Sequence, residues 1–109
     1  MNVLQNTIWQ QDITQQFCDV LCTISDRASM QGFLSDVMTE KEINEMSARL
    51  QAAKMLKAGS KYTEIIATTG LSSRTVARIS DWMQSGNNGY DTALMLLAQH
   101  HSHMSPARA

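Results

Sequence analysis

The sequence is poor in the residues that interrupt helices. Its 109 residues include one proline, Pro106, and only five glycines. The lone proline lies near the C-terminus, so the region expected to fold contains none. This favours helices over a strand-rich fold with many tight turns.

Cysteines, long apolar runs and targeting features are also scarce. Two cysteines are too few for a disulfide framework, which indicates a reduced, cytoplasmic protein. No apolar stretch approaches the ~20 residues that a membrane span needs, and the start of the sequence lacks the basic and apolar blocks of a secretory signal. We expect one domain without membrane association, since 43% hydrophobic residues in a chain of this length suit a single core.

Motifs for catalysis and metal binding are missing as well. The sequence has no glycine-rich phosphate loop, no G-x-S-x-G motif and no paired carboxylates beside a histidine, so we expect no enzyme. Cys18 and Cys22 share a helix face, but zinc needs two further ligands. The histidines His100, His101 and His103 lie in a tail predicted to fray, so no metal site is expected.

Apolar residues recur at the spacing of a helix face along most of the chain. The pattern predicts helices over residues 8–25, 28–37 and 40–58. At the start of the third helix, Thr39 and Glu42 are spaced as a capping box, in which each side chain accepts from the other residue's amide. The sequence therefore defines where this third helix begins.

The stretch from Tyr62 to Trp82 has the spacing of a helix-turn-helix. A short helix, with Thr63 as its expected N-cap, ends at Gly70, where the sharp turn needs a residue that accepts positive φ. A second helix begins at Ser72 and runs to about residue 85. In this motif the second helix enters the major groove of DNA.

The second helix divides into a buried and an exposed side. Val76 and Ile79, followed by Met83 or Trp82, are expected to face the core. The remaining side is small, hydroxylated and basic, which suits close approach to phosphates and base edges. With one lysine that precedes the motif, the candidate DNA-binding residues are Lys61, Ser72, Ser73, Arg74, Thr75 and Arg78.

The net charge of −1 at first argues against a nucleic-acid partner, but the charge is unevenly distributed. Residues 41–80 contain seven basic and three acidic side chains, a net charge of +4, whereas residues 1–40 carry −4. The basic excess coincides with the helix-turn-helix, where phosphate contacts would need it.

Two helices carry more apolar surface than a single subunit needs. Helix-turn-helix proteins normally dimerise to read two half-sites, and the first and last predicted helices could form the interface. Packing within one subunit is the alternative for any single residue. The candidate dimerisation residues are Trp9, Ile13, Phe17, Ile24, Leu94 and Leu97.

From Met38 to Asp91, about half of the chain, the sequence resembles the tryptophan repressor superfamily, and most of all its YerC/YecD group. The matching pieces are MTEKEINEMSARLQAAKMLKAG, YTEIIATTGLSSRTVARI and GNNGY. The resemblance implies an all-α fold of about six helices with a helix-turn-helix, assembled as an intertwined homodimer. It also implies binding to double-stranded DNA in the bacterial cytoplasm or nucleoid.

The resemblance further points to an effector pocket between the long helix and the recognition helix. Thr39, Arg49 and Arg78 match residues of the co-repressor pocket in the tryptophan repressor. Ile79, however, stands where that repressor has a glycine, and its branched side chain would fill the slot for the indole ring. We therefore expect no tryptophan co-repressor and no cofactor, although another small effector remains open.

These observations assign a role to each part of one structural domain. Residues 1–38 and 87–99 would dimerise, residues 39–86 would bind DNA, and residues 100–109 would form a flexible tail. The predicted function is a sequence-specific transcriptional regulator, a repressor. Two alternatives are a DNA-binding accessory of a transposition or replication system and a helical protein-interaction module.

Overall fold

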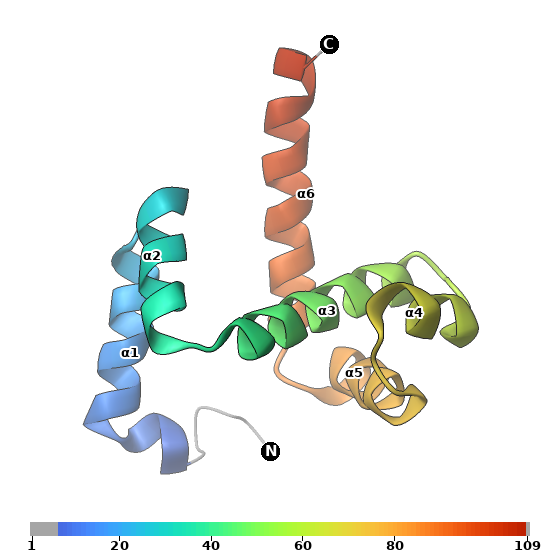
Figure 1. The fold of residues 1–109 in the computed structure, drawn as a ribbon, viewed down its shortest axis with the longest axis horizontal. Coiled ribbons are helices and arrows are strands. Elements are labelled where there is room, and N and C mark those ends of the chain that lie inside the picture. The colour runs from blue at the N-terminus through green and yellow to red at the C-terminus, as the bar shows by residue number, and fades with distance from the viewer. Residues whose placement is uncertain (1–6, 109) are drawn as a thin grey trace. The chain divides into compact units, whose positions relative to one another are not determined.

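The computed structural model describes the backbone of residues 7–108 and the side chains of residues 7–100. Over these residues the fold is all-α, with six α-helices, one short 3-10 helix and no strand, as the sequence predicted. None of these helices is both long and apolar enough to span a membrane. The elements are η2 (Thr7–Gln10), α1 (Asp12–Thr23), α2 (Arg27–Val37), α3 (Glu40–Lys57), α4 (Tyr62–Thr69), α5 (Ser73–Ser85) and α6 (Gly89–Arg108) (Figure 1).

The chain forms two compact units, Met1–Glu45 and Met46–Ala109, and the boundary between them falls within α3. Each unit is described by itself below. The first contains η2, α1 and α2 with the start of α3, and the second contains the rest of α3 with α4, α5 and α6.

The N-terminal helix is interrupted near its start, where the sequence predicted one helix over residues 8–25. The side chain of Thr14 donates to the carbonyl of Ile8, and the side chain of Gln15 donates to the carbonyl of Trp9. These side chains satisfy carbonyls that a continuous helix would bond through its backbone. The chain therefore forms η2 first, and α1 begins separately.

The two helices of the first unit, α1 and α2, pack together through a pair of aromatic rings. The rings of Phe17 on α1 and Phe33 on α2 have centroids 6.0 Å apart, with planes tilted by 39°. The carboxylate of Asp26 caps α2 by accepting from the Ser29 amide at 2.8 Å. No described side chain of this unit is fully buried.

The capping box predicted for α3 is confirmed. The Thr39 amide donates to the Glu42 carboxylate at 2.8 Å, and the Glu42 amide donates to the Thr39 hydroxyl at 3.1 Å. After the helix, Gly59 has a φ of +86°. Such a positive φ favours glycine and ends the helix where the sequence predicted.

The core of the second unit is small and lies between α3, α4 and α5. Ala52 and Ala53 present short side chains on α3, which lets the neighbouring helices approach closely. Around the core pack half-buried residues that include Tyr90 and Leu94 of α6. The fully buried residues are Ala52, Ala53, Ile65, Val76 and Ile79.

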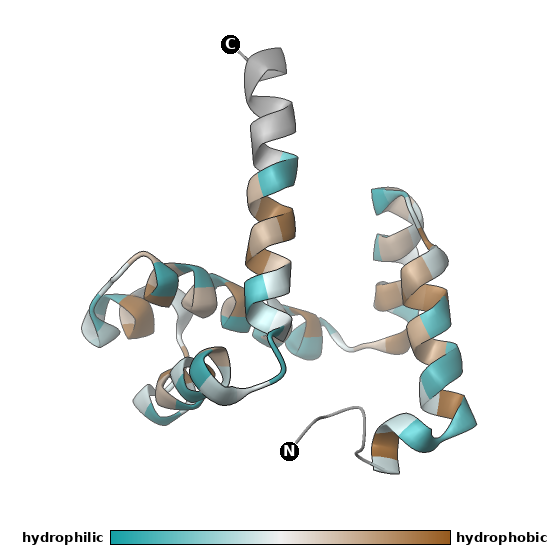
Figure 2. Cartoon of the chain, turned by 180° about the vertical axis from the view of Figure 1, so that it is seen from behind, coloured by the Kyte–Doolittle hydropathy of each residue, from teal (hydrophilic) through white to brown (hydrophobic). Residues whose placement is uncertain are grey.

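The last helix, α6, continues to Arg108 and so includes residues 100–108 of the segment that we assigned to a tail. Hydrophobic residues are spread along α6 and α1 in Figure 2, between hydrophilic ones. The division of roles along the chain that we expected from the sequence stays a prediction.

Candidate nucleic-acid interface

The turn between α4 and α5 is fixed by its backbone and by one threonine. Gly70 has φ +74° and ψ 3°, in the left-handed region that the sequence predicted for it. The Thr69 hydroxyl donates to the Ile65 carbonyl at 2.7 Å and accepts from the Leu71 amide at 3.2 Å. Leu71 packs against the core, so the turn holds the two helices at a defined angle.

The N-terminus of α5 is capped as predicted. The Ser72 hydroxyl accepts from the Thr75 amide at 3.1 Å, and the two hydroxyl oxygens lie 3.0 Å apart. The other amides in the first turn have no acceptor within the helix. They can therefore donate to an anion such as a phosphate.

The two sides of α5 differ sharply in burial. Val76 and Ile79 are fully buried, and Met83 packs against the core, whereas Trp82 is 47% exposed. This resolves the alternative that the sequence left open in favour of Met83.

The opposite side of α5 displays the polar and basic residues. Ser73, Arg74 and Arg78 are exposed, and Thr75 is half-buried. The arginines are four residues apart, so they are neighbours on one helix face. This face can reach an anionic surface without disturbing the core.

Lys61 lies at the start of α4, and its side chain is exposed. It is also the N-cap residue, so the prediction of Thr63 as N-cap was wrong. The helix begins at Tyr62 because the Glu64 carboxylate accepts from the Lys61 amide at 3.4 Å, which fixes the helix start two residues earlier.

The residues matched to an effector pocket fall in different parts of the chain. Thr39 belongs to the first unit, where its hydroxyl and amide bond to Glu42. Arg49 is half-buried and Arg78 is exposed, both in the second unit. Ile79 lies in the core with no exposed surface, as a residue that fills space would.

The candidate dimerisation residues differ in exposure. Ile13 is 73% exposed and Phe17 43% exposed, whereas Trp9, Ile24 and Leu94 are half-buried. Leu97 is 36% exposed.

Further exposed apolar residues, which were not among the candidate dimerisation residues, lie on the same helices. They are Val20 on α1 and Met95 and Leu96 on α6. Val20 could have been included from the sequence, because it follows Phe17 at the spacing of one helix face.

Cys18 is half-buried and Cys22 is exposed, and no disulfide joins them. Across the part of the chain whose side chains are described, no three His, Cys, Asp or Glu residues gather as a metal site would require. His101 and His103 lie outside that part.

The chain is similar to several known proteins. Residues 11–98 match the family model of the Trp repressor protein. Over 83 residues, the chain is 32% identical to the uncharacterized protein YerC of Bacillus subtilis (strain 168), covering 76% of this chain and 79% of YerC. This confirms the resemblance to the YerC group that the sequence indicated.

Two crystal structures share the fold. A candidate Trp repressor from Staphylococcus aureus gives a TM-score of 0.79 at 31% identity, covering 86% of this chain and 94% of that one. A TrpR-like protein from Eubacterium eligens ATCC 27750 gives a TM-score of 0.80 at 30% identity, covering 85% of this chain and 96% of that one.

Proposed function

The chain belongs to the Trp repressor protein family, and on this premise we propose that it is a sequence-specific DNA-binding regulator that represses transcription as a homodimer. The observation that carries the proposal is the exposed polar side of α5. It displays Arg74 and Arg78 beside a Ser72-capped helix start, while Val76 and Ile79 on the other side hold the helix to the core.

The exposed residues suggest a division of roles. Arg74 and Thr75, in the first turn of the recognition helix, would contact base edges, because the N-terminal residues of such a helix reach the floor of the groove. Lys61, Ser72, Ser73 and Arg78 would contact phosphates, which fixes the position of the protein on the duplex.

The apolar residues of α1 and α6 support a dimer. Ile13, at 73% exposure, and Phe17 lie on α1, and Leu97 lies on α6. A second copy that covered these residues would remove apolar surface from water and would place two recognition helices on one DNA site.

Tryptophan is not expected to be the effector. The side chain of Ile79 is completely buried among core residues, which supports the expectation that an indole ring would not fit at that position. Thermal unfolding with excess tryptophan should leave the midpoint unchanged, whereas a bound co-repressor would raise it. A clear rise would contradict this part of the proposal.

Genome-wide mapping of bound sites, followed by binding measurements on the enriched sequence, tests the DNA-binding function. We expect tight, salt-sensitive binding to that sequence and weaker binding to a scrambled duplex of equal length. If the purified protein binds neither duplex at low ionic strength, the proposed function is wrong. Transcription from a promoter that carries the site should fall when the protein is present, whereas a rise would indicate an activator.

A further inference from the structure

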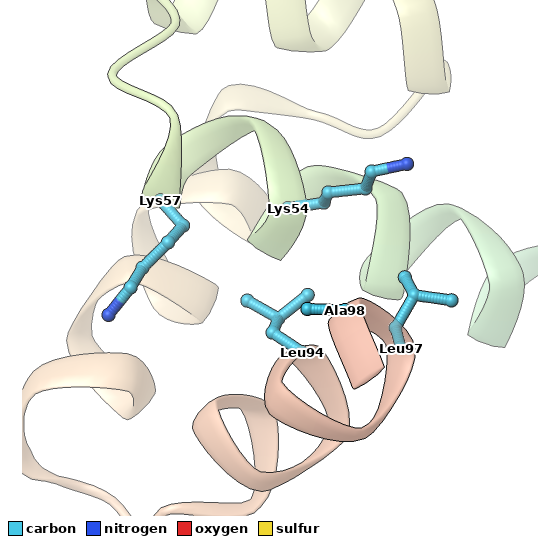
Figure 3. A pocket seen from close by; sticks show the side chains of 5 residues that line it. All are labelled: Lys54, Lys57, Leu94, Leu97 and Ala98. Carbon is cyan, nitrogen blue, oxygen red and sulfur yellow. The ribbon is translucent and has the colours of Figure 1, made fainter. Parts of the chain in front are cut away.

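The second unit has an apolar side and a polar side. On the apolar side, a hollow beside the last turns of α3 is lined by Leu94, Leu97 and Ala98 of α6, together with Lys54 and Lys57 (Figure 3). Leu94 and Leu97 are candidate dimerisation residues, so a second copy is expected to cover this hollow. The exposed side of α5 is the surface that the proposed homodimer leaves open to DNA.

Three charged side chains lie in one row along the exposed side of α5. Arg78 and Asp81 follow Arg74 by four and by seven residues, and all three side chains are exposed. With about 3.6 residues per turn, Asp81 lies within roughly 20° of Arg74 around the helix axis. This charged stripe, made of Arg74, Arg78 and Asp81, therefore carries an acid among its basic residues.

The carboxylate of Asp81 is not explained by the fold. Among the residues whose side chains are described, it takes part in no hydrogen bond or ion pair. The Ser85 hydroxyl donates to the backbone carbonyl of Asp81, at 3.0 Å, and not to its side chain. An acid in the C-terminal half of a helix also gains nothing from the helix dipole. Local stability therefore does not account for an acid at this position.

The charged stripe can meet DNA in two ways. In a specific complex α5 is expected to lie in the major groove, which is about 12 Å wide, so a residue on the midline of the stripe lies about 6 Å from each row of phosphates. In sequence-independent binding the protein is held by phosphates alone, and the same stripe rests on the DNA backbone. Asp81 would then face phosphates at the close distances that Arg74 and Arg78 need.

We infer that Asp81 is a specificity-determining residue, which disfavours binding to the DNA backbone alone. The inference rests on the proposed DNA-binding function. Repulsion between a carboxylate and phosphates falls with distance and is screened by salt, so it acts more strongly on the backbone-bound state than on the state with α5 in the groove. Specificity is a difference between affinities, and the acid widens that difference by opposing the unwanted complexes.

Asp81→Asn removes the charge and keeps the shape of the side chain. Affinity for a scrambled duplex should rise about threefold to fivefold, as expected for one exposed ionic interaction, whereas affinity for the preferred site should change by less than about twofold. Binding to the scrambled duplex should also depend more steeply on salt, since the variant can neutralise up to about one more phosphate. Anisotropy titrations of both duplexes at several salt concentrations measure these changes.

Two control variants separate the position of the charge from the net charge. Asp81→Glu keeps the carboxylate on the charged stripe and should keep the wild-type ratio of the two affinities. Asp36→Asn makes the same change in net charge at an exposed acid of α2, and it should also leave the ratio unchanged.

The inference is overturned if Asp81→Asn raises both affinities by the same factor, because the carboxylate would then act on every duplex alike. A loss of affinity for the preferred site alone would also overturn it, since the carboxylate would then accept from a base amino group. Specific binding by the wild type with an unchanged ratio in Asp81→Asn refutes this inference and leaves the proposed function standing. Binding of the wild type to neither duplex refutes the proposed function, and the inference with it.

Discussion

Gly70 and Gly86 both require glycine, but for different reasons. Gly70 has positive φ, and a Cβ atom there would meet nothing within 4 Å, so only the backbone conformation matters. Gly86 has negative φ, but a Cβ atom there would lie 2.4 Å from the carbonyl oxygen of Trp82. At this second position crowding at the end of α5 excludes a side chain.

Gly70→Ala should lower the free energy of unfolding by about 1–2 kcal/mol, because an L-residue resists the left-handed conformation. Urea unfolding followed by circular dichroism measures the change. Gly32→Ala is the matched control, since Gly32 lies inside α2 with open space around it. That substitution should be neutral or stabilising by up to ~1 kcal/mol, and equal losses at both positions would contradict the role given to the turn.

Arg74 and Lys61 separate base contacts from phosphate contacts. Arg74→Ala should cost about 1–3 kcal/mol of binding to the preferred site and relax the preference at one base position. Lys61→Ala should weaken binding to all sequences alike and reduce the salt dependence. Anisotropy titrations on a set of single-base variants at two salt concentrations distinguish these patterns. Identical profiles for the two variants would reject the assignment.

At the level of the elements, helix starts are set by local hydrogen bonds. Asp26 caps α2, the Thr39–Glu42 pair caps α3, and Ser72 caps α5. The amides of Ser29 and Thr39 and their hydroxyls bond to the carboxylates of Asp26 and Glu42, and this lowers the pKa of each carboxyl. These caps therefore depend on the charged form of the acid.

Glu42 makes the cap of α3 sensitive to acid. Its pKa in the folded chain lies below the usual value of 4.5, so the unfolded chain binds a proton first as pH falls. The stabilisation is complete above that value and is lost as pH drops through the lowered pKa. Side-chain NMR titration should show the lowered pKa, and Thr39→Val should move it back towards the usual value because the hydroxyl donor is removed. No movement would mean that the hydroxyl contact contributes nothing.

Much of the secondary structure could be predicted, because it depends on neighbours in the sequence. The Thr39–Glu42 box, the Gly70 turn and the Ser72 cap each involve residues at most a few positions apart. The predictions failed where side chains compete for the backbone, as at Thr14, or where a cap is shifted, as at Lys61. Spacing alone also could not choose between Met83 and Trp82, which are adjacent at the edge of the buried side.

The candidate site was only partly predictable. Helical spacing predicted that Val76 and Ile79 are buried. It also predicted that Arg74 and Arg78 are exposed, because they do not lie on the buried side of α5. The packing of Tyr90 and Leu94 against a core that contains Ala52 and Ala53 was not foreseen, because it joins residues that lie about 40 positions apart in the sequence. Such pairings depend on helix packing, which periodicity does not specify.

At the level of the whole molecule, burial is confined to one of the two units. The second unit contains every fully buried residue among those described, whereas α1 and α2 contain none. Exposed Ile13 on α1 illustrates the contrast, at 73% of its surface. Extended apolar surface exposed on a helix is typical of association surfaces, and we expect α1 to contribute one.

Ile13→Ser tests that surface. Because the side chain is mostly exposed in the single chain, the substitution should leave the helical content unchanged. It should weaken dimer formation by at least about tenfold, since a buried isoleucine contributes roughly 1.5–3 kcal/mol. Analytical ultracentrifugation measures the change. Cys22→Ser, also exposed on α1, is the control and should assemble like the wild type. Equal assembly of both variants would exclude α1 from the interface.

The uneven burial also bears on how long the protein would survive in the cell. An unassembled subunit offers α1 and α2 to proteases, because segments without buried side chains open locally at little cost. Assembly would cover the same segments and slow their cleavage. Turnover would then fall as the protein accumulates, so orphan subunits would be removed and the pool of assembled regulator would be spared.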